Sequence, residues 1–157
     1  MAIAKQPALL LLDEPLASLD PLARREFLQG LMEIVASHGI SVMLSSHLIA
    51  DLERVCDYLV LLVASHIQLA GEITELLATH HRLSGPRRDQ GSLPSSYEVI
   101  EASHTEKQST LLVHTDQPIL DPAWTVKPVT LDELVLAYMG QARTPSPLRR
   151  PGLKVVS

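Results

Sequence analysis

Four consecutive leucines, Leu9–Leu12, run directly into Asp13, Glu14 and Pro15. A short apolar run that ends at a breaker is typical of a strand buried on both faces of a sheet. Parallel sheets of this kind belong to α/β folds, in which helices cover the strands. The sequence therefore predicts an α/β fold in which Asp13 and Glu14 follow the carboxyl end of a buried strand.

The two adjacent acids stand where an α/β sheet commonly binds a ligand, at the carboxyl ends of its strands. A pair of carboxylates there suits a magnesium–nucleotide site. Asp13 would hold the water shell of the metal, and Glu14 would take a proton from an attacking water. The alternative is a turn that carries acids only because turns favour aspartate.

Two further motifs follow in order. Residues 17–21 read ASLDP, and a second apolar run ends in Ser45-Ser46-His47. The order LLLLDEP, ASLD and SSH resembles the Walker B strand, the D-loop and the switch histidine of ABC transporter ATP-binding subunits. The resemblance continues through residues 55–72, where the family has a hairpin, and extends to about Gly140.

The resemblance implies part of a P-loop NTPase core, with ATP and Mg²⁺ as cofactors. It assigns Asp13 to the metal and Glu14 to general base catalysis. It assigns His47 to a contact with the γ-phosphate. Ser18 and Asp20, in the D-loop, would reach the site of a second ATP-binding subunit in a dimer.

These roles have structural alternatives. N-capping alone explains an aspartate such as Asp20 before Pro21, because that pair commonly opens a helix. His47 could instead cap a helix or be a buried structural histidine, and Glu14 could be a surface acid beside Asp13.

The printed sequence has no GxxxxGK[ST] loop, and its first glycine is Gly30. In the family this loop, the Q-loop and the LSGGQ signature all precede Walker B. Leu83-Ser84-Gly85 looks like a signature fragment, but it follows His47 and continues with Pro86, so we reject it. We expect a C-terminal portion of a transporter ATPase subunit, inactive alone because it lacks the loop that cradles phosphates.

Two alternatives to this function remain open. One is a non-catalytic fragment from a split or mis-started gene, which docks on a full-length subunit or has no activity. The other, ranked lower, is a soluble ABC-type ATPase of DNA repair or translation. Repair types carry long heptad arms and translation types carry two tandem cassettes, and the sequence has neither.

Composition restricts the partners. A net charge of −5, from 13 basic and 18 acidic residues, argues against nucleic acid, which is bound through clustered Lys and Arg. The single cysteine, Cys56, cannot form an internal disulfide, as is usual in a reducing compartment. The resemblance implies transmembrane permease subunits as partners and a cytoplasmic location on the inner face of the membrane.

The pattern of elements predicts four regions along the chain. Residues 2–5 are expected to end a helix. Helical periodicity with Asp20 and Gly39 as caps predicts a helix between two strands. A helix at about 48–56, a hairpin of 58–63 and 67–70 and a short helix at 72–80 are expected to follow, and strands at 97–103, 109–115 and near 124–127 precede a helix at 131–139. A stretch rich in Gly, Pro and Ser then predicts a linker. The predicted regions are the C-terminal part of a nucleotide-binding domain at 1–81, the linker at 82–96, a small α+β segment at 97–140 and a disordered tail at 141–157.

Overall fold

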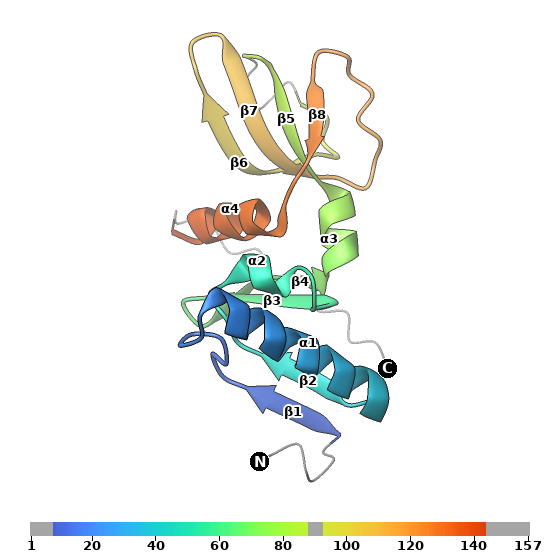
Figure 1. The fold of residues 1–157 in the computed structure, drawn as a ribbon. Coiled ribbons are helices and arrows are strands. Elements are labelled where there is room, and N and C mark those ends of the chain that lie inside the picture. Colours follow the sequence, from blue (N-terminus) through green and yellow to red (C-terminus); the bar gives the residue numbers. More distant parts are fainter. Residues whose placement is uncertain (1–7, 88–92, 144–157) are drawn as a thin grey trace. The chain divides into compact units, whose positions relative to one another are not determined.

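The computed structural model describes residues 8–87 and 93–143, a mixed α/β chain (Figure 1). The chain divides into two compact units, residues 1–56 and residues 57–157. The helix end expected at residues 2–5, residues 88–92 of the expected linker and most of the expected tail lie outside the described residues. Among the described helices, none is long and apolar enough to cross a bilayer.

The first unit is built on two parallel strands and one long helix. Its elements are β1 (Leu9–Leu12), α1 (Pro21–His38), β2 (Ser41–Leu44) and α2 (Ile49–Leu52). The register of the pair runs from Leu9 opposite Ser41 to Leu12 opposite Leu44. Helix α1 places Leu31 against Leu10 and Ile40, and this cluster is the core of the unit.

Both ends of α1 are fixed by the residues that the sequence indicated. The Asp20 carboxylate accepts hydrogen bonds from the amides of Leu22 and Ala23, so two donors of the first turn are satisfied. Gly39 ends the helix with φ 63°, a left-handed conformation that glycine adopts without steric cost, and its amide donates to the Val35 carbonyl. The predicted caps are therefore confirmed.

The expectation that the leucine strand is buried on both faces is wrong for the described residues. Side chains alternate between the faces of a strand, so Leu10 and Leu12 face α1 while Leu9 and Leu11 face away. Leu9 is 51% exposed, Leu11 65% and Met43 62%. No described element of this unit covers that face, which is why the apolar run is only half buried.

The second unit begins with a hairpin of β3 (Tyr58–Val63) and β4 (His66–Glu72). Ala64 and Ser65 join the strands with φ of 49° and 62°. A tight two-residue turn of this kind needs positive φ at both of its residues. Its twist then matches the twist of the flanking strands. The hairpin predicted around these residues is confirmed.

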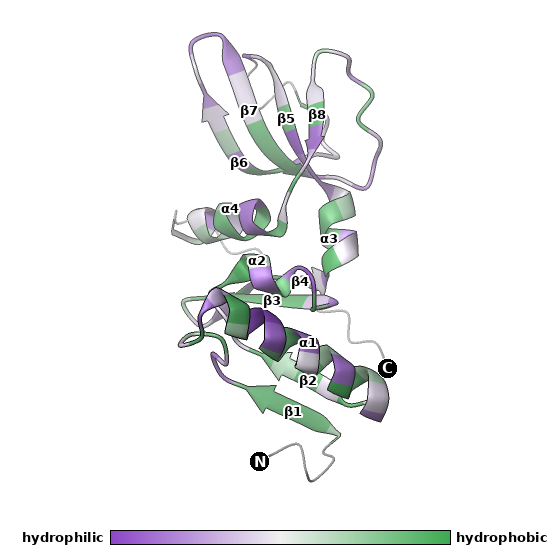
Figure 2. Ribbon diagram, in the orientation of Figure 1, coloured by the Kyte–Doolittle hydropathy of each residue, from purple (hydrophilic) through white to green (hydrophobic). Residues whose placement is uncertain are grey.

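A four-stranded antiparallel sheet and two helices complete this unit. The sheet order is β6-β7-β5-β8, and Leu83 from β5 packs with Leu111, Val113 and Trp124 in its core. Green apolar segments mark these strands in Figure 2. The remaining elements are α3 (Ile73–Thr79), β5 (His80–Pro86), β6 (Glu98–His104), β7 (Gln108–His114), β8 (Thr125–Pro128) and α4 (Leu131–Arg143).

Residues 82–86 were expected to belong to a linker, and this is wrong because they form most of β5. Gly85 is a glycine because neighbouring atoms pack closely against it, and it does not mark a loop. A Cβ at Gly85 would lie 2.6 Å from the Ala123 carbonyl oxygen and 2.8 Å from the Trp124 ring, so only glycine fits. The division between the compact units falls at Cys56, not at residues 82–96.

The helix expected from about Leu48 to Cys56 is also shorter than predicted. Only Ile49–Leu52 is helical, and hydrogen-bonded turns continue to Cys56, whose amide donates to the Leu52 carbonyl. The predicted strands and helix of residues 97–139 are confirmed as β6, β7, β8 and α4, with end points shifted by a few residues.

Candidate functional site

The parallel register brings the residues that follow β1 and β2 together at one edge of the sheet. The Ser45 amide donates to the Leu12 carbonyl at 2.9 Å, which extends the pairing one step beyond the strands. The Ser45 hydroxyl donates to the Asp13 carboxylate at 2.6 Å and accepts the Glu14 amide at 2.8 Å. One serine therefore holds both members of the acidic pair.

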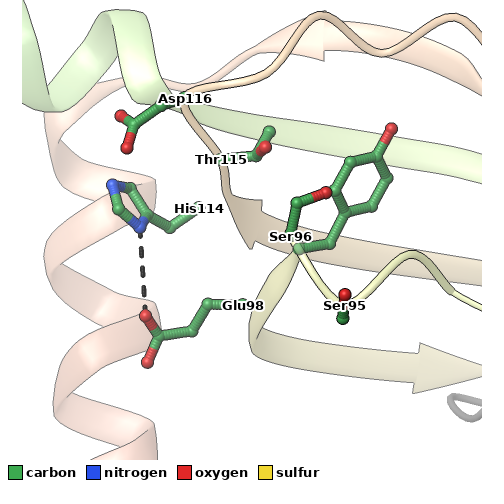
Figure 3. A pocket seen from close by; sticks show the side chains of 7 residues that line it. Ser95, Ser96, Glu98, His114, Thr115 and Asp116 are labelled. Atoms are coloured by element: carbon green, nitrogen blue, oxygen red, sulfur yellow. Dashed lines mark ion pairs between the residues drawn. The ribbon is translucent and has the colours of Figure 1, made fainter.

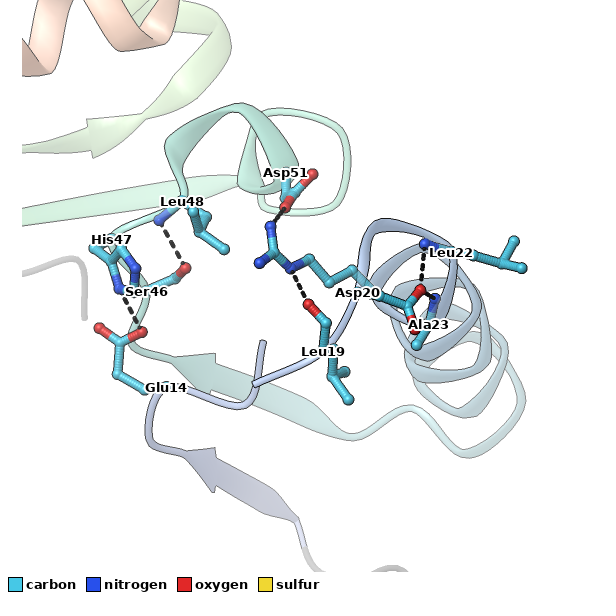
Figure 4. Close-up of polar contacts among 10 residues, drawn as sticks. Glu14, Leu19, Asp20, Leu22, Ala23, Ser46, His47, Leu48 and Asp51 are labelled. Atoms are coloured by element: carbon cyan, nitrogen blue, oxygen red, sulfur yellow. Dashed lines mark hydrogen bonds and ion pairs between the residues drawn. The ribbon is translucent and has the colours of Figure 1, made fainter. Parts of the chain in front are cut away.

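Glu14 and His47 contact each other across this edge (Figure 4). The His47 Nδ1 lies 2.9 Å from Glu14 Oε2. Because an ionised carboxylate only accepts hydrogen bonds, Nδ1 is the nitrogen that donates, which leaves Nε2 directed elsewhere. The two side chains are 40% and 65% exposed, so they meet in a solvent-accessible position.

The backbone at Glu14 adopts φ 44°, in the left-handed region. This conformation is uncommon for a residue with a Cβ and costs free energy that the surrounding structure must repay. The hydrogen bond from the Glu14 amide to Ser45 and the turn bond from the Ala17 amide to the Glu14 carbonyl hold it in place. Strain of this kind is concentrated at functional positions in proteins.

The residues predicted to form a D-loop lie in the turn between β1 and α1. Leu16 is fully buried and anchors this turn, and Ser18 is exposed. Arg24 donates to the Leu19 carbonyl at 2.9 Å and lies 3.9 Å from Asp51 (Figure 4). Asp20 is the N-cap of α1, which is the structural role that the sequence offered as the alternative to a D-loop role.

The structure thus brings Asp13, Glu14 and His47 together, while Asp20 binds the helix end. Sequence reasoning did not assign a role to Ser45. The signal was present, since Ser45 follows the second strand as Asp13 follows the first. Only the observed pairing of Leu12 with Leu44 makes the two residues neighbours.

Several curated proteins are similar to this chain. The molybdenum import ATP-binding protein ModC of Rhodobacter capsulatus is 43% identical over 77 residues, which is 49% of this chain and 21% of ModC. The ABC transporter ATP-binding protein YtrB of Bacillus subtilis is 27% identical over 158 residues, covering 91% of this chain and 52% of YtrB. The chain resembles the ATP-binding proteins of ABC transporters. The ABC-type protein EcsA of Bacillus subtilis is 37% identical over 75 residues.

The resemblance rests on matches to individual proteins. No protein-family model matches the chain. The chain spans about half the length of YtrB and about a fifth of ModC. The predicted resemblance to ABC transporter ATP-binding proteins is confirmed.

The carboxyl edge of β1 and β2 carries a donor set that suits Mg²⁺ only in part. Mg²⁺ in nucleotide sites is usually held by one or two carboxylates, with waters and phosphates completing the shell. Asp13 offers such a carboxylate, oriented by Ser45. Among the described residues, no group of three or more His, Cys, Asp or Glu is placed to hold a metal by itself. The donor set fits a metal that arrives with a nucleotide.

Proposed function

We propose that this chain supplies the Walker B, D-loop and switch-histidine part of an ATP-hydrolysing site in an ABC transporter. The observation that carries the proposal is the gathering of Asp13, Glu14, Ser45 and His47 at the carboxyl edge of a parallel strand pair. ATP binding and hydrolysis would drive transport through transmembrane permease subunits, from the cytoplasmic face of the membrane. The relatives do not favour a non-catalytic docking fragment, because they are named ATP-binding proteins.

Each residue at the edge has a defined task in this proposal. Asp13 would hold Mg²⁺, and the metal would supply positive charge that neutralises the phosphates. The Ser45 hydroxyl keeps the Asp13 carboxylate in one orientation and fixes the Glu14 backbone. The Glu14 carboxylate takes a proton from the attacking water. His47 turns from Glu14 to the γ-phosphate, where a hydrogen bond stabilises charge that develops in the transition state.

The proposed reaction also needs groups that this sequence does not contain. A GxxxxGK[ST] loop provides the amides and the lysine that bind the phosphates. Ser18 and Asp20 would act across a dimer with a second ATP-binding subunit. Because the printed sequence has no such loop, we expect the 157-residue chain alone to show no Mg-ATP binding in the micromolar range by calorimetry.

The decisive experiment joins residues 8–157 to the part of YtrB that precedes its matching strand, so that the chimera carries a phosphate loop. Glu14→Gln in this chimera should retain ATP and lower the hydrolysis rate by about 10²–10⁴, because glutamine cannot accept the proton. Glu26→Gln, an exposed acid on α1, is the control and should leave the rate unchanged. Hydrolysis by Glu14→Gln at close to the parent rate would refute the assigned base.

Two further variants of the chimera separate the metal from the base. Asp13→Asn should raise the Mg²⁺ concentration needed for half-maximal hydrolysis, because it removes charge near the metal. Ser45→Ala should do the same to a smaller extent, since it leaves the carboxylate but removes its hydrogen-bond donor. An unchanged Mg²⁺ dependence in both variants contradicts the metal assignment.

A further inference from the structure

The two segments that carry the acidic pair and His47 are joined at two places. We call them the β1–α1 turn, residues 13–20, and the β2–α2 segment, residues 45–52. Where they leave the strands, Ser45 forms hydrogen bonds to both acids. Farther along the chain, the side chain of Arg24 joins the two segments a second time, from the first turns of α1. The segments are thus held together both at the strand ends and beyond them.

The Arg24 guanidinium holds one residue of each segment. Its Nε donates to the Leu19 carbonyl at 2.9 Å, and its Nη1 lies 3.9 Å from the Asp51 carboxylate (Figure 4). The side chains of Arg24 and Asp51 are 26% and 38% exposed, so water screens this pair less than it screens a fully exposed one. Because the guanidinium is planar and rigid, it fixes Leu19 and Asp51 relative to each other.

Turn hydrogen bonds connect the Leu19 end of this bridge to Glu14. The Ala17 amide donates to the Glu14 carbonyl at 3.2 Å, and the Leu19 amide donates to the Leu16 carbonyl at 3.2 Å. Leu16 is fully buried, which anchors the middle of the turn. A turn that is closed by two such bonds and a buried side chain resists bending, so a shift of Leu19 also displaces Glu14.

The Asp51 end of the bridge is connected to His47 in the same way. The Leu48 amide donates to the Ser46 hydroxyl at 3.0 Å, and the Asp51 amide donates to the Leu48 carbonyl at 3.3 Å. His47 stands between Ser46 and Leu48, inside this hydrogen-bonded segment. A movement of Asp51 is therefore passed on to the backbone of His47.

We propose that Arg24 is a positioning residue, which keeps the β1–α1 turn and the β2–α2 segment at the spacing that ATP hydrolysis requires. The contact between Glu14 and His47 also joins the segments in the structure. This role rests on the proposed function, in which His47 turns to the γ-phosphate and that contact opens. Arg24 then keeps His47 within reach of the phosphate. A displacement of about 1 Å caused far from the chemistry can cost about 10²-fold in rate.

The first test needs no nucleotide. In the full 157-residue chain, Arg24→Ala should shift the NMR signals of the His47 ring, because the β2–α2 segment loses its bridge. Arg25→Ala, at the exposed arginine next in sequence, is the matched control and should leave these signals in place. His114 is the internal reference, since its ring lies in the second unit with Glu98 3.9 Å away (Figure 3). Identical His47 signals in Arg24→Ala and in the parent overturn the proposal.

The second test uses the chimera that carries a phosphate loop. Arg24→Ala should lower kcat for ATP hydrolysis about tenfold and leave KM within about twofold, because the bridge orients His47 and does not bind the nucleotide. Arg24→Lys should recover little of this loss, since one ammonium group cannot hold Leu19 and Asp51 together. A parent-like kcat in Arg24→Ala, or full recovery in Arg24→Lys, overturns the proposal.

Asp51→Asn attacks the other end of the bridge and decides the matter if Arg24→Ala does not fold. It should lower kcat and shift the His47 signals, and unchanged values of both overturn the proposal. In the double variant the losses in kcat should not add, because both substitutions open the same bridge. Additive losses would show two separate roles and contradict it. Failure of the proposed function looks different, because the parent chimera would then hydrolyse no ATP while the His47 signals still reported the bridge.

Discussion

The two units of this chain bury their strands to different extents. In residues 57–157, strands from three parts of the sequence form a four-stranded sheet whose core residues Leu83 and Val113 are fully buried. In residues 1–56, the sheet has two strands of four residues, and one of its faces leaves Leu9, Leu11 and Met43 exposed. Parallel strands are normally covered on both faces.

The residues that we propose to act in ATP hydrolysis lie in the unit with the smaller core. The acidic pair, its serine and His47 stand at the edge of the unit with the smaller core, whereas the unit with the closed core carries none of them. We therefore expect residues 57–157 to be the more stable unit. Residues 1–56 would reach full stability only when the exposed face of β1 and β2 is covered.

The largest expected effect comes from opening the core of the second unit. Leu83→Ala should lower its free energy of unfolding by about 2–5 kcal/mol, because it removes buried methyl groups and leaves a cavity. Urea unfolding followed by Trp124 emission measures this. Leu11→Ala, in the exposed face of β1, should leave the same transition unchanged. Equal sensitivity to both substitutions would show that the units unfold as one.

The second prediction concerns the pH dependence of the same unit. Burial lowers the pKa of His80 from 6.5 to about 4, so between these values the unfolded chain binds a proton that the folded chain excludes. This contribution to stability is complete above pH 6.5 and is lost as pH falls toward 4. The loss should reach about 3 kcal/mol in the free energy of unfolding, measured by urea titrations at a series of pH values.

The control for this prediction is His80→Gln, which should flatten the curve between pH 6.5 and 4. His81, His114 and Glu98 lie near His80, and Tyr138 contacts it, in both proteins. The difference between the two curves therefore isolates His80. Identical curves for parent and variant would contradict the assignment.

Much of this fold was readable from local signals. Asp20-Pro21 and Gly39 define α1 because caps depend on residues next to the helix end. The hairpin at Ala64-Ser65 followed from two apolar runs around a short polar stretch. The apolar run placed Asp13 and Glu14 at the carboxyl end of a strand, and the resemblance to ABC transporter ATP-binding subunits added His47 to them.

What the sequence did not reveal depends on contacts between distant residues. Gly85 was interpreted as a loop residue because its approach to Trp124 cannot be seen along the chain. The contact of His80 with His114 and Tyr138 joins three elements that no motif connects. Ser45 gained its role only through the register of β1 and β2. Sequence patterns predicted most of the elements, whereas contacts between distant residues determined these three details.

The third prediction tests α1, the only helix that covers the described sheet of the first unit. Asp20→Ala should lower the stability of residues 1–56 by about 1 kcal/mol, because the Leu22 and Ala23 amides lose their acceptor. Thermal unfolding followed by circular dichroism measures the change. Asp20→Asn retains a cap acceptor and should be nearly neutral. A large loss in Asp20→Asn would show that charge, not capping, is the main contribution.

The smallest effect on stability is expected at the exposed face of β1. Leu11→Thr should change the free energy of unfolding by no more than about 0.5 kcal/mol, because a 65% exposed side chain has few contacts to lose. We expect the parent chain to self-associate at micromolar concentration through this exposed apolar face, and Leu11→Thr should weaken that association. Leu22→Thr is the matched control, because Leu22 is also 65% exposed but lies on α1. Sedimentation equilibrium should show weaker association for Leu11→Thr and parent-like association for Leu22→Thr. Equal association in both variants would contradict the idea that the exposed face of β1 and β2 drives self-association.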